Sequence, residues 1–139
     1  MHRSTIQLLR LPFSFFPMPV YLFALSLVPD IHALHAILIF VILHGLVYPS
    51  SNGYNSYMDR DETPIGGLSK PMQPTKELFR VTILLDFVAV AAGLLVSYWF
   101  AICMVAYIAA SRAYSYRGIR LKKYPVTGYI TVILFQGAL

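Results

Sequence analysis

The sequence predicts an all-α protein, a multi-pass transmembrane bundle of about five helices. Of its 139 residues, 58% are hydrophobic and 12% are charged, about half the charged share of an ordinary soluble domain. The apolar residues lie in runs long enough to cross a bilayer, which takes roughly 20 helical residues. All Lys and Arg residues lie outside those runs. This composition excludes a disordered tail and disfavours a water-soluble fold.

The first two apolar runs, residues 11–28 and 33–48, predict the first two spans. A kink is expected in the first run because it contains three prolines, Pro12, Pro17 and Pro19. Arg3 and Arg10 precede this run, as basic residues precede a secretory signal peptide. The run lacks an A-x-A cleavage site, which favours a retained, kinked span.

Residues 81–110 contain no Lys or Arg, and as a single helix they would be about 45 Å long, too long for one bilayer. We therefore predict two helices that form a hairpin, with its turn near Ser97 and Tyr98. Trp99 is then expected at the membrane interface. A fifth apolar run extends over residues 126–139.

In this arrangement all eleven basic residues lie on one side of the membrane. They precede the first span, follow the second and follow the fourth: Arg3, Arg10, Arg60, Lys70, Lys76, Arg80, Arg112, Arg117, Arg120, Lys122 and Lys123. Basic residues accumulate on the cytoplasmic side, so we expect the N-terminus and the loops after the second and fourth helices there. The net charge of +5 then indicates membrane lipid or a phosphorylated ligand as partner, and no nucleic acid.

The densest polar chemistry lies in residues 52–64, directly after the second run. At the helical rotation per residue, oxygen-bearing side chains share a face about 120° wide: Asn52, Asn55, Ser56, Asp59, Glu62 and Thr63. Asp61 points elsewhere, which suits a supporting role or exposure to solvent. Carboxylates mixed with amides and hydroxyls, without Cys or His, suit Mg²⁺ bound together with substrate phosphates. The alternative is a solvated helix end that holds no metal.

Basic residues near this segment allow two interpretations. Lys70, in the loop after it, and the later cluster that includes Arg120 and Lys122 could supply the positive charge that a diphosphate needs. The later cluster could equally be only the charge signal of a cytoplasmic membrane boundary.

Two ionisable residues lie within apolar runs. His44 would share a face with Asn55 on an unbroken helix, but we expect Pro49 to interrupt that helix, so a buried, hydrogen-bonded histidine is predicted. Asp86 is either a functional residue or a carboxylate satisfied by a neighbouring helix.

At this point the chain resembles the UbiA superfamily of membrane prenyltransferases. The family motif N-D-x-x-D-x-x-x-D, at the end of its second helix, is similar to residues 55–63. Asn55 and Asp59 match this motif, while Ser56 and Thr63 replace two of its Asp residues. The resemblance implies that Asn55 and Asp59 are catalytic residues that bind Mg²⁺ and diphosphate. Asp61 or Glu62 is then expected to provide a further metal ligand.

Three further stretches carry the resemblance. The first-helix pattern L-R-x-P-F is found at residues 9–13, and Lys70-Pro71 is similar to an R-P pair that follows the family motif. Residues 114–123 resemble Y-S-x-x-x-x-R-L-K-R after the fourth helix, without the usual prolines. The resemblance implies a diphosphate-binding set of Lys70, Tyr114, Arg120 and Lys122.

The family fold implies a bundle of about nine membrane helices, of which residues 1–139 would be the N-terminal half of one domain. No D-x-x-x-D motif follows residue 86, so the second metal-binding half is absent from this sequence. The implied reaction is Mg²⁺-dependent transfer of a polyprenyl group from polyprenyl diphosphate to an aromatic or other lipophilic acceptor, with these 139 residues inactive alone. The alternative is a non-catalytic membrane fragment or subunit that binds isoprenoid or lipid. Transport is disfavoured because the charges cluster at one surface.

Overall fold

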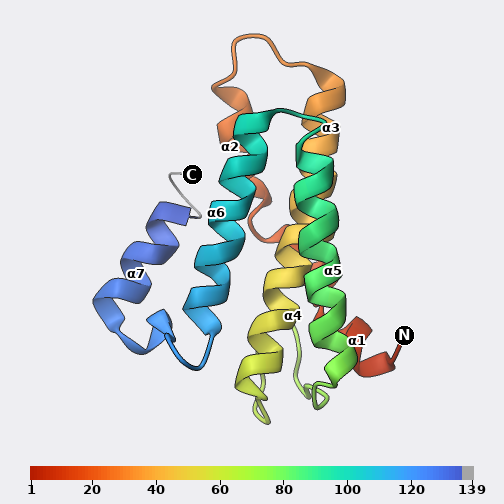
Figure 1. Cartoon of the computed structure of the whole chain (residues 1–139), viewed down its shortest axis with the longest axis vertical. Coiled ribbons are helices and arrows are strands. Elements are labelled where there is room, and N and C mark those ends of the chain that lie inside the picture. Colours follow the sequence, from red (N-terminus) through yellow and green to blue (C-terminus); the bar gives the residue numbers. More distant parts are fainter. Residues whose placement is uncertain (136–139) are drawn as a thin grey trace.

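The computed structural model describes residues 1–135, and in this part of the chain all regular secondary structure is helical. The all-α prediction is therefore confirmed for these residues. Figure 1 shows the elements in chain order: α1 (Arg3–Leu8), η1 (Leu11–Phe15), α2 (Met18–Ser26), α3 (Ala33–Val41), η2 (Ile42–Val47), α4 (Tyr48–Asp59), α5 (Lys76–Gly93), α6 (Tyr98–Ser115), η3 (Leu121–Lys123) and α7 (Pro125–Ile133).

The N-terminal helices are bent where the prolines predict it. The segments Arg3–Phe15 and Met18–Ser26 meet at an angle of 40°. Pro12 and Pro19 lie in the first turns of η1 and α2, where a missing backbone N–H costs no helical hydrogen bond. The kink prediction is confirmed.

The elements α3, η2 and α4 form one continuous helix from Ala33 to Asp59. The predicted interruption at Pro49 is wrong. The segment η2 is π-helical, and the backbone N–H of Tyr48 binds the carbonyl of Leu43, five residues back. Pro49 thus enters the first turn of the following α-helical segment, where its ring and its missing donor are tolerated.

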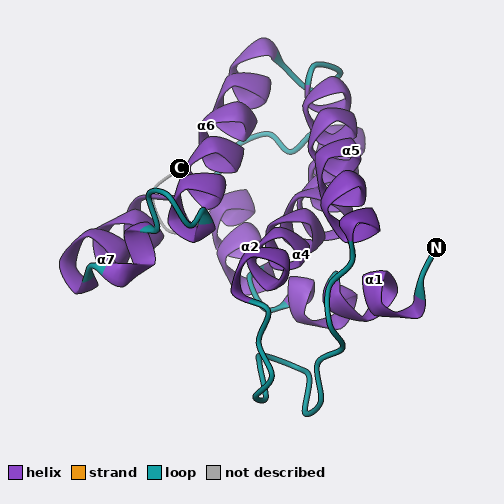
Figure 2. Cartoon of the chain, turned by 60° about the horizontal axis from the view of Figure 1, so that its bottom comes forward, coloured by secondary structure: helices purple, strands orange, loops and turns teal. Residues whose placement is uncertain are grey.

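The predicted hairpin is also confirmed. Helices α5 and α6 are joined by a short turn at residues 94–97. The hydroxyl of Ser97 accepts a hydrogen bond of 3.0 Å from the backbone N–H of Phe100, and this cap begins α6. Figure 2 shows the longer loop between α4 and α5, residues 60–75, which extends from the opposite end of the molecule.

Two clusters of buried apolar side chains hold the helices together. One joins η2 to α5 and α6 and includes Ile42, Ala89 and Met104. The other joins α1 to α5 and includes Leu8 and Leu78. Helix α7 begins one residue before the start expected for the fifth run. Residues 136–139, the remainder of that run, lie outside the described residues.

One helix of the described part is long and apolar enough to cross a membrane, the 27-residue helix Ala33–Asp59. The bent pair Arg3–Phe15 and Met18–Ser26 adds a second only if the pair counts as one span. Helix α5 is 18 residues long but carries charged residues: Lys76, Glu77, Arg80 and Asp86. The structure therefore supports fewer crossings than the five that the sequence predicts.

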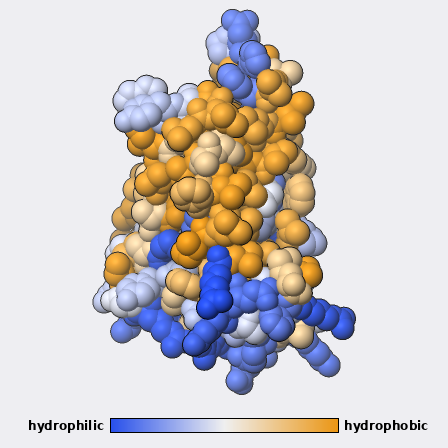
Figure 3. All heavy atoms as spheres, turned by 45° about the vertical axis from the view of Figure 1, so that its right-hand side comes forward, coloured by the Kyte–Doolittle hydropathy of each residue, from blue (hydrophilic) through white to orange (hydrophobic). Residues whose placement is uncertain are grey.

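The surface is divided between an apolar band and a polar end. Figure 3 shows the band over the middle of the molecule, with most hydrophilic residues gathered at the lower end and a smaller group at the upper end. Exposed apolar side chains come from five helices: Phe23, Leu34, Phe87, Ile102 and Val126. The loops that carry the basic residues lie at the lower end of Figure 1, while the turn at residues 94–97 lies at the upper end.

Candidate functional site

The C-terminal end of α4 meets the segment after α6 at the polar end of the molecule. Asn55 and Asp59 lie one turn apart on α4. The ammonium Nζ of Lys122 donates to Oδ1 of Asn55 at 2.8 Å and forms an ion pair with Oδ2 of Asp59. Nη2 of Arg120 donates to the other carboxylate oxygen of Asp59, Oδ1, at 3.2 Å. The structure thus brings together four of the predicted site residues. Arg120 and Asp59 are 61 positions apart in the sequence, and Lys122 and Asn55 are 67 positions apart.

These charges differ in their exposure to water. The side chains of Asp59 and Lys122 are 12% and 19% exposed, while that of Arg120 is 44% exposed. Water screens a partly buried ion pair less than an exposed one. Lys122 is therefore the dominant electrostatic partner of Asp59, and Arg120 contributes less.

The backbone after α6 explains how Lys122 reaches α4. Arg120 adopts a left-handed conformation with φ of 48°, and its N–H binds the carbonyl of Tyr116 at 2.7 Å. This turn sends η3 back toward α4. Nε of Arg117 donates to the carbonyl of Met58 at 2.9 Å, which places positive charge at the negative end of the α4 dipole.

Helix α4 ends at Asp59, so the predicted oxygen-bearing face is shorter than expected. Arg60 is left-handed, with φ of 54°, and this conformation terminates the helix. The expected helical placement of Glu62 and Thr63 is therefore wrong, and Glu62 lies exposed in the loop. Asp61 lies close enough to Arg10 to act on its charge.

The described residues contain no group of three or more His, Cys, Asp or Glu side chains arranged to hold a metal ion. Asp61 and Glu62 thus do not join Asp59 in such a group, and their role as metal ligands stays a prediction. The oxygens of Asn55 and Asp59 nevertheless both contact one cationic group, the ammonium of Lys122. That convergence fits a hard cation such as Mg²⁺, which needs only one or two protein ligands when phosphates and water complete its shell.

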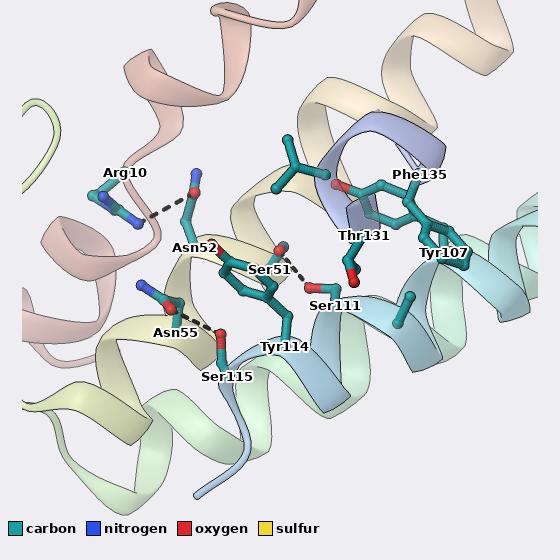
Figure 4. A pocket seen from close by; sticks show the side chains of 12 residues that line it. Arg10, Ser51, Asn52, Asn55, Tyr107, Ser111, Tyr114, Ser115, Thr131 and Phe135 are labelled. Carbon is teal, nitrogen blue, oxygen red and sulfur yellow. Dashed lines mark hydrogen bonds between the residues drawn. The ribbon is translucent and has the colours of Figure 1, made fainter. Parts of the chain in front are cut away.

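A pocket of about 210 Å³ opens beside Asn55, between α4, α6 and α7 (Figure 4). Tyr114, a predicted diphosphate ligand, lines it. Two hydrogen bonds cross it from α4 to α6, between the hydroxyls of Ser51 and Ser111 at 2.6 Å and from the Ser115 hydroxyl to Oδ1 of Asn55 at 2.7 Å. The other lining residues are Arg10, Asn52, Tyr107, Ala110, Thr131, Val132 and Phe135. The pocket is polar on its α4 and α6 sides and partly apolar toward α7.

A second hollow, of about 330 Å³, adjoins the first. The two share Ser51, Asn52 and Tyr107 in their walls. The second is lined mainly by apolar residues of the N-terminal helices, among them Phe16 and Val20. Together the hollows lead from polar groups near Asn55 to an apolar region.

Arg10 and Asn52 line this pocket, although the sequence analysis did not place Arg10 among the site residues. Nη2 of Arg10 donates to Oδ1 of Asn52 at 3.3 Å, and Nδ2 of Asn52 donates to the hydroxyl of Ser14 at 3.1 Å. Arg10 is 8% exposed. Asn52 was on the predicted polar face, but nothing in the sequence indicates a contact between residues 42 positions apart.

The i, i+4, i+7, i+8 spacing of residues 107, 111, 114 and 115 could have indicated the other wall. This spacing places Tyr107, Ser111, Tyr114 and Ser115 on one face of a helix. All four line the pocket.

Lys70 is the predicted diphosphate ligand that the structure does not bring to the site. It is exposed in the loop between α4 and α5, and its backbone carbonyl accepts a hydrogen bond of 3.3 Å from Nε2 of Gln7. Its side chain does not line the pocket beside Asn55.

The two ionisable residues of the apolar runs have structural partners. Asp86 accepts from Nε of Arg112 at 3.0 Å and from the Ser50 hydroxyl at 2.6 Å. The guanidinium of Arg112 lies 4.0 Å from the centre of the Tyr54 ring. Asp86 is therefore satisfied by neighbouring helices, and Arg112 lies inside the bundle. His44 is 1% exposed, with Nδ1 3.1 Å from the Phe40 carbonyl, which confirms the buried, hydrogen-bonded histidine.

Comparison of the chain with protein-family models, with curated proteins and with solved structures gave no match.

Proposed function

We propose that this chain forms part of an integral, multi-pass membrane protein that binds a polyprenyl diphosphate and transfers its polyprenyl group to an aromatic or other lipophilic acceptor. One observation carries the proposal. The two segments that resemble prenyltransferase motifs, far apart in the sequence, meet through Lys122 and Arg120 at Asn55 and Asp59. A diphosphate needs such a concentration of cationic donors beside oxygen ligands for a metal ion.

The side chains at this end support the departure of a diphosphate. Lys122 and Arg120 would donate to its oxygens, where negative charge develops as the bond to the allylic carbon breaks. Bound Mg²⁺, held by Asn55 and Asp59, would neutralise further charge on the same group. Tyr107 and Tyr114 line the adjoining pocket, and their ring faces could stabilise the allylic cation that remains.

The surface supports a membrane location. Exposed apolar side chains come from five helices and form a band on the face seen in Figure 3, and the basic loops share one end (Figure 1). A soluble monomer rarely exposes so large an apolar area. In this proposal the band faces lipid, the hairpin α5–α6 crosses twice, and the basic end is cytoplasmic. A lipophilic substrate would then enter from the bilayer.

A non-catalytic membrane component that binds isoprenoid or lipid is the second candidate. One observation favours it: among residues 1–135, Asp59 does not belong to a group of three or more His, Cys, Asp or Glu side chains that could hold a metal ion. Such a component would retain diphosphate binding at Lys122 and Arg120 without group transfer.

The test uses the full-length protein of which this chain forms part, in bilayer nanodiscs with Mg²⁺ and a fluorescent polyprenyl diphosphate. It measures binding, and then transfer of the polyprenyl group to a panel of aromatic and lipophilic acceptors. Asp59→Ala is expected to reduce both steeply, while Asp30→Ala, which removes an exposed acid from the loop between α2 and α3, leaves them unchanged. Binding that depends on Asp59 without transfer to any acceptor favours the second candidate. Binding and transfer that are unchanged in Asp59→Ala would overturn the assigned site.

A further inference from the structure

The ammonium of Lys122 lies where a metal ion shared by Asn55 and Asp59 would have to lie. It contacts Oδ1 of Asn55 at 2.8 Å and Oδ2 of Asp59, and the side chains of Lys122 and Asp59 are both largely buried. These oxygens lie one helical turn apart, so a single small cation bridges them. A divalent cation bound to the same oxygens would be within a few ångströms of the ammonium and would repel it strongly. Lys122 and a metal ion therefore compete for this position.

The Lys122 side chain can move away from Asn55 and Asp59. It is carried by η3, a helix of three residues, rather than by one of the long helices. Its flexible four-carbon stem lets the charge move while the backbone stays in place. The backbone itself is fixed by the left-handed turn at Arg120, and the Cα atom of Lys122 lies close to Gly128 of α7. Movement of the side chain therefore needs no rearrangement of the helices.

The oxygens of a diphosphate can bind the Lys122 ammonium in place of Asn55 and Asp59, and they can also act as ligands of a metal ion. Phosphate oxygens attract a lysine as a point charge, and they complete the shell of a divalent cation that has few protein ligands. Arg120 already contacts the second oxygen of Asp59, so an anion beside Asp59 would be met by two basic side chains.

We infer that Lys122 is an exchangeable internal cation that holds Asn55 and Asp59 until a diphosphate draws it away and admits the divalent cation. Metal and diphosphate then bind in concert, and the metal binds weakly alone. This inference rests on the diphosphate site of the proposed function. It requires no statement about which acceptor, if any, receives a polyprenyl group.

The experiment measures Mn²⁺ binding by electron paramagnetic resonance on the full chain in nanodiscs, with and without inorganic diphosphate. Lys122→Met removes the competing charge, so Mn²⁺ alone is expected to bind at least roughly tenfold more tightly than to the unsubstituted chain. Diphosphate is expected to tighten Mn²⁺ binding at least roughly tenfold in the unsubstituted chain, and less in Lys122→Met.

Two further variants and one control complete the design. Lys122→Gln keeps a hydrogen-bonding side chain without the charge, and it should also bind Mn²⁺ alone more tightly. Lys123→Met removes a neighbouring, exposed lysine and should leave Mn²⁺ binding unchanged. Asp59→Asn should weaken Mn²⁺ binding in every condition, which shows that the measured ion is at this site.

The inference is overturned if both Lys122 variants bind Mn²⁺ alone no more tightly than the unsubstituted chain, or if no variant binds it. It is also overturned if diphosphate does not tighten Mn²⁺ binding to the unsubstituted chain while calorimetry shows that diphosphate binds. Failure of the proposed function has a different signature. In that case diphosphate does not bind at all. The affinity for Mn²⁺ without diphosphate, compared between Lys122→Met and the unsubstituted chain, still decides whether the lysine competes with the metal ion.

Discussion

At the scale of single residues, the ion pair of Asp86 and Arg112 connects three helices. Asp86 and Arg112 lie between α4, α5 and α6, with side chains 14% and 17% exposed. Ser50 of α4 donates to Asp86 and accepts from Nη2 of Arg112 at 2.9 Å. This network joins the helix that carries Asn55 and Asp59 to the hairpin that carries the facing pocket wall.

Removing one member of this ion pair should destabilise the protein strongly. We expect Asp86→Ala to lower the free energy of unfolding by about 3–5 kcal/mol, because it leaves the Arg112 charge buried without its carboxylate. Thermal unfolding in detergent would show this as a large decrease in Tm. The double substitution Asp86→Leu with Arg112→Met should recover much of the loss. A Tm unchanged in Asp86→Ala would show that water already solvates the pair.

A second residue-scale prediction concerns pH. The carboxylate of Glu77 accepts from the backbone N–H of His2 at 2.9 Å, and this hydrogen bond lowers the pKa of Glu77 below its ordinary value of 4.5. The charged form is thus favoured in the folded chain. Its stabilising effect is complete above pH 4.5 and is lost as the pH falls below that value, through the pKa in the folded chain.

The first residues should therefore detach from α5 in acid. Hydrogen exchange of the backbone amides at residues 2–6 is expected to accelerate below pH 4.5, beyond the intrinsic pH dependence of exchange. In Glu77→Gln the amides should exchange faster already at neutral pH, with no further acid transition. An acid transition that persists in Glu77→Gln would assign it to another group.

At the scale of elements, close packing at Gly53 sets the distance between α4 and its neighbours. A Cβ atom at this position would lie 2.9 Å from Cγ2 of Thr82, 3.0 Å from Cδ2 of Leu9 and 3.1 Å from Cδ1 of Leu78. Only glycine lets α4 approach α1 and α5 this closely. Gly45, in the preceding segment η2 of the continuous helix Ala33–Asp59, offers a contrast, because a Cβ atom there would meet only Cγ1 of Val41, at 3.9 Å.

Alanine at these two glycines should therefore have different effects. Gly45→Ala gains helix propensity without a steric cost, whereas Gly53→Ala pushes against three side chains. We expect the free energy of unfolding of Gly53→Ala to lie at least about 1 kcal/mol below that of Gly45→Ala. Equal Tm values for the two variants would mean that α4 and α5 can separate at little cost.

The elements also show which features can be predicted from sequence. The hairpin and the proline kink depend on local signals, namely run length, charge asymmetry and fixed proline geometry, and both were predicted. The end of α4 was not, because the left-handed Arg60 is a conformation that an arginine rarely adopts. The continuity through Pro49 was not predicted either, since a π-helical segment leaves no mark in hydropathy.

At the scale of the whole molecule, pairs distant in the sequence decide the site. Asn55 and Lys122 were identified separately from two motifs, and their contact follows from the hairpin, which returns the chain to the same end. The contact of Arg10 with Asn52 and that of Asp86 with Arg112 depend on packing that no local pattern encodes. Hence the sequence named four residues that the structure brings together, whereas the pocket and its supporting network could not be predicted.

The proposed membrane orientation, with the hairpin as two crossings and the basic end cytoplasmic, predicts the result of a labelling experiment. In a background with Cys103→Ser, Lys123→Cys places a thiol at the basic end, and Ser97→Cys places one at the opposite end (Figure 1). A membrane-impermeant maleimide added to inside-out vesicles should label Lys123→Cys and not Ser97→Cys, and intact cells should show the reverse. Labelling of both from the same side would exclude the hairpin as a pair of membrane crossings.

The π-helical segment η2 sets the rotation of α4 about the helix axis relative to α3. One residue more or fewer in this segment would turn α4 relative to α3 by about 100°. Asn55 and Asp59 would then swing away from Lys122, although the composition, the mean hydropathy and both motifs would be almost unchanged. The orientation of the polar end relative to the apolar helix before it thus depends on the length of one six-residue segment, Ile42–Val47.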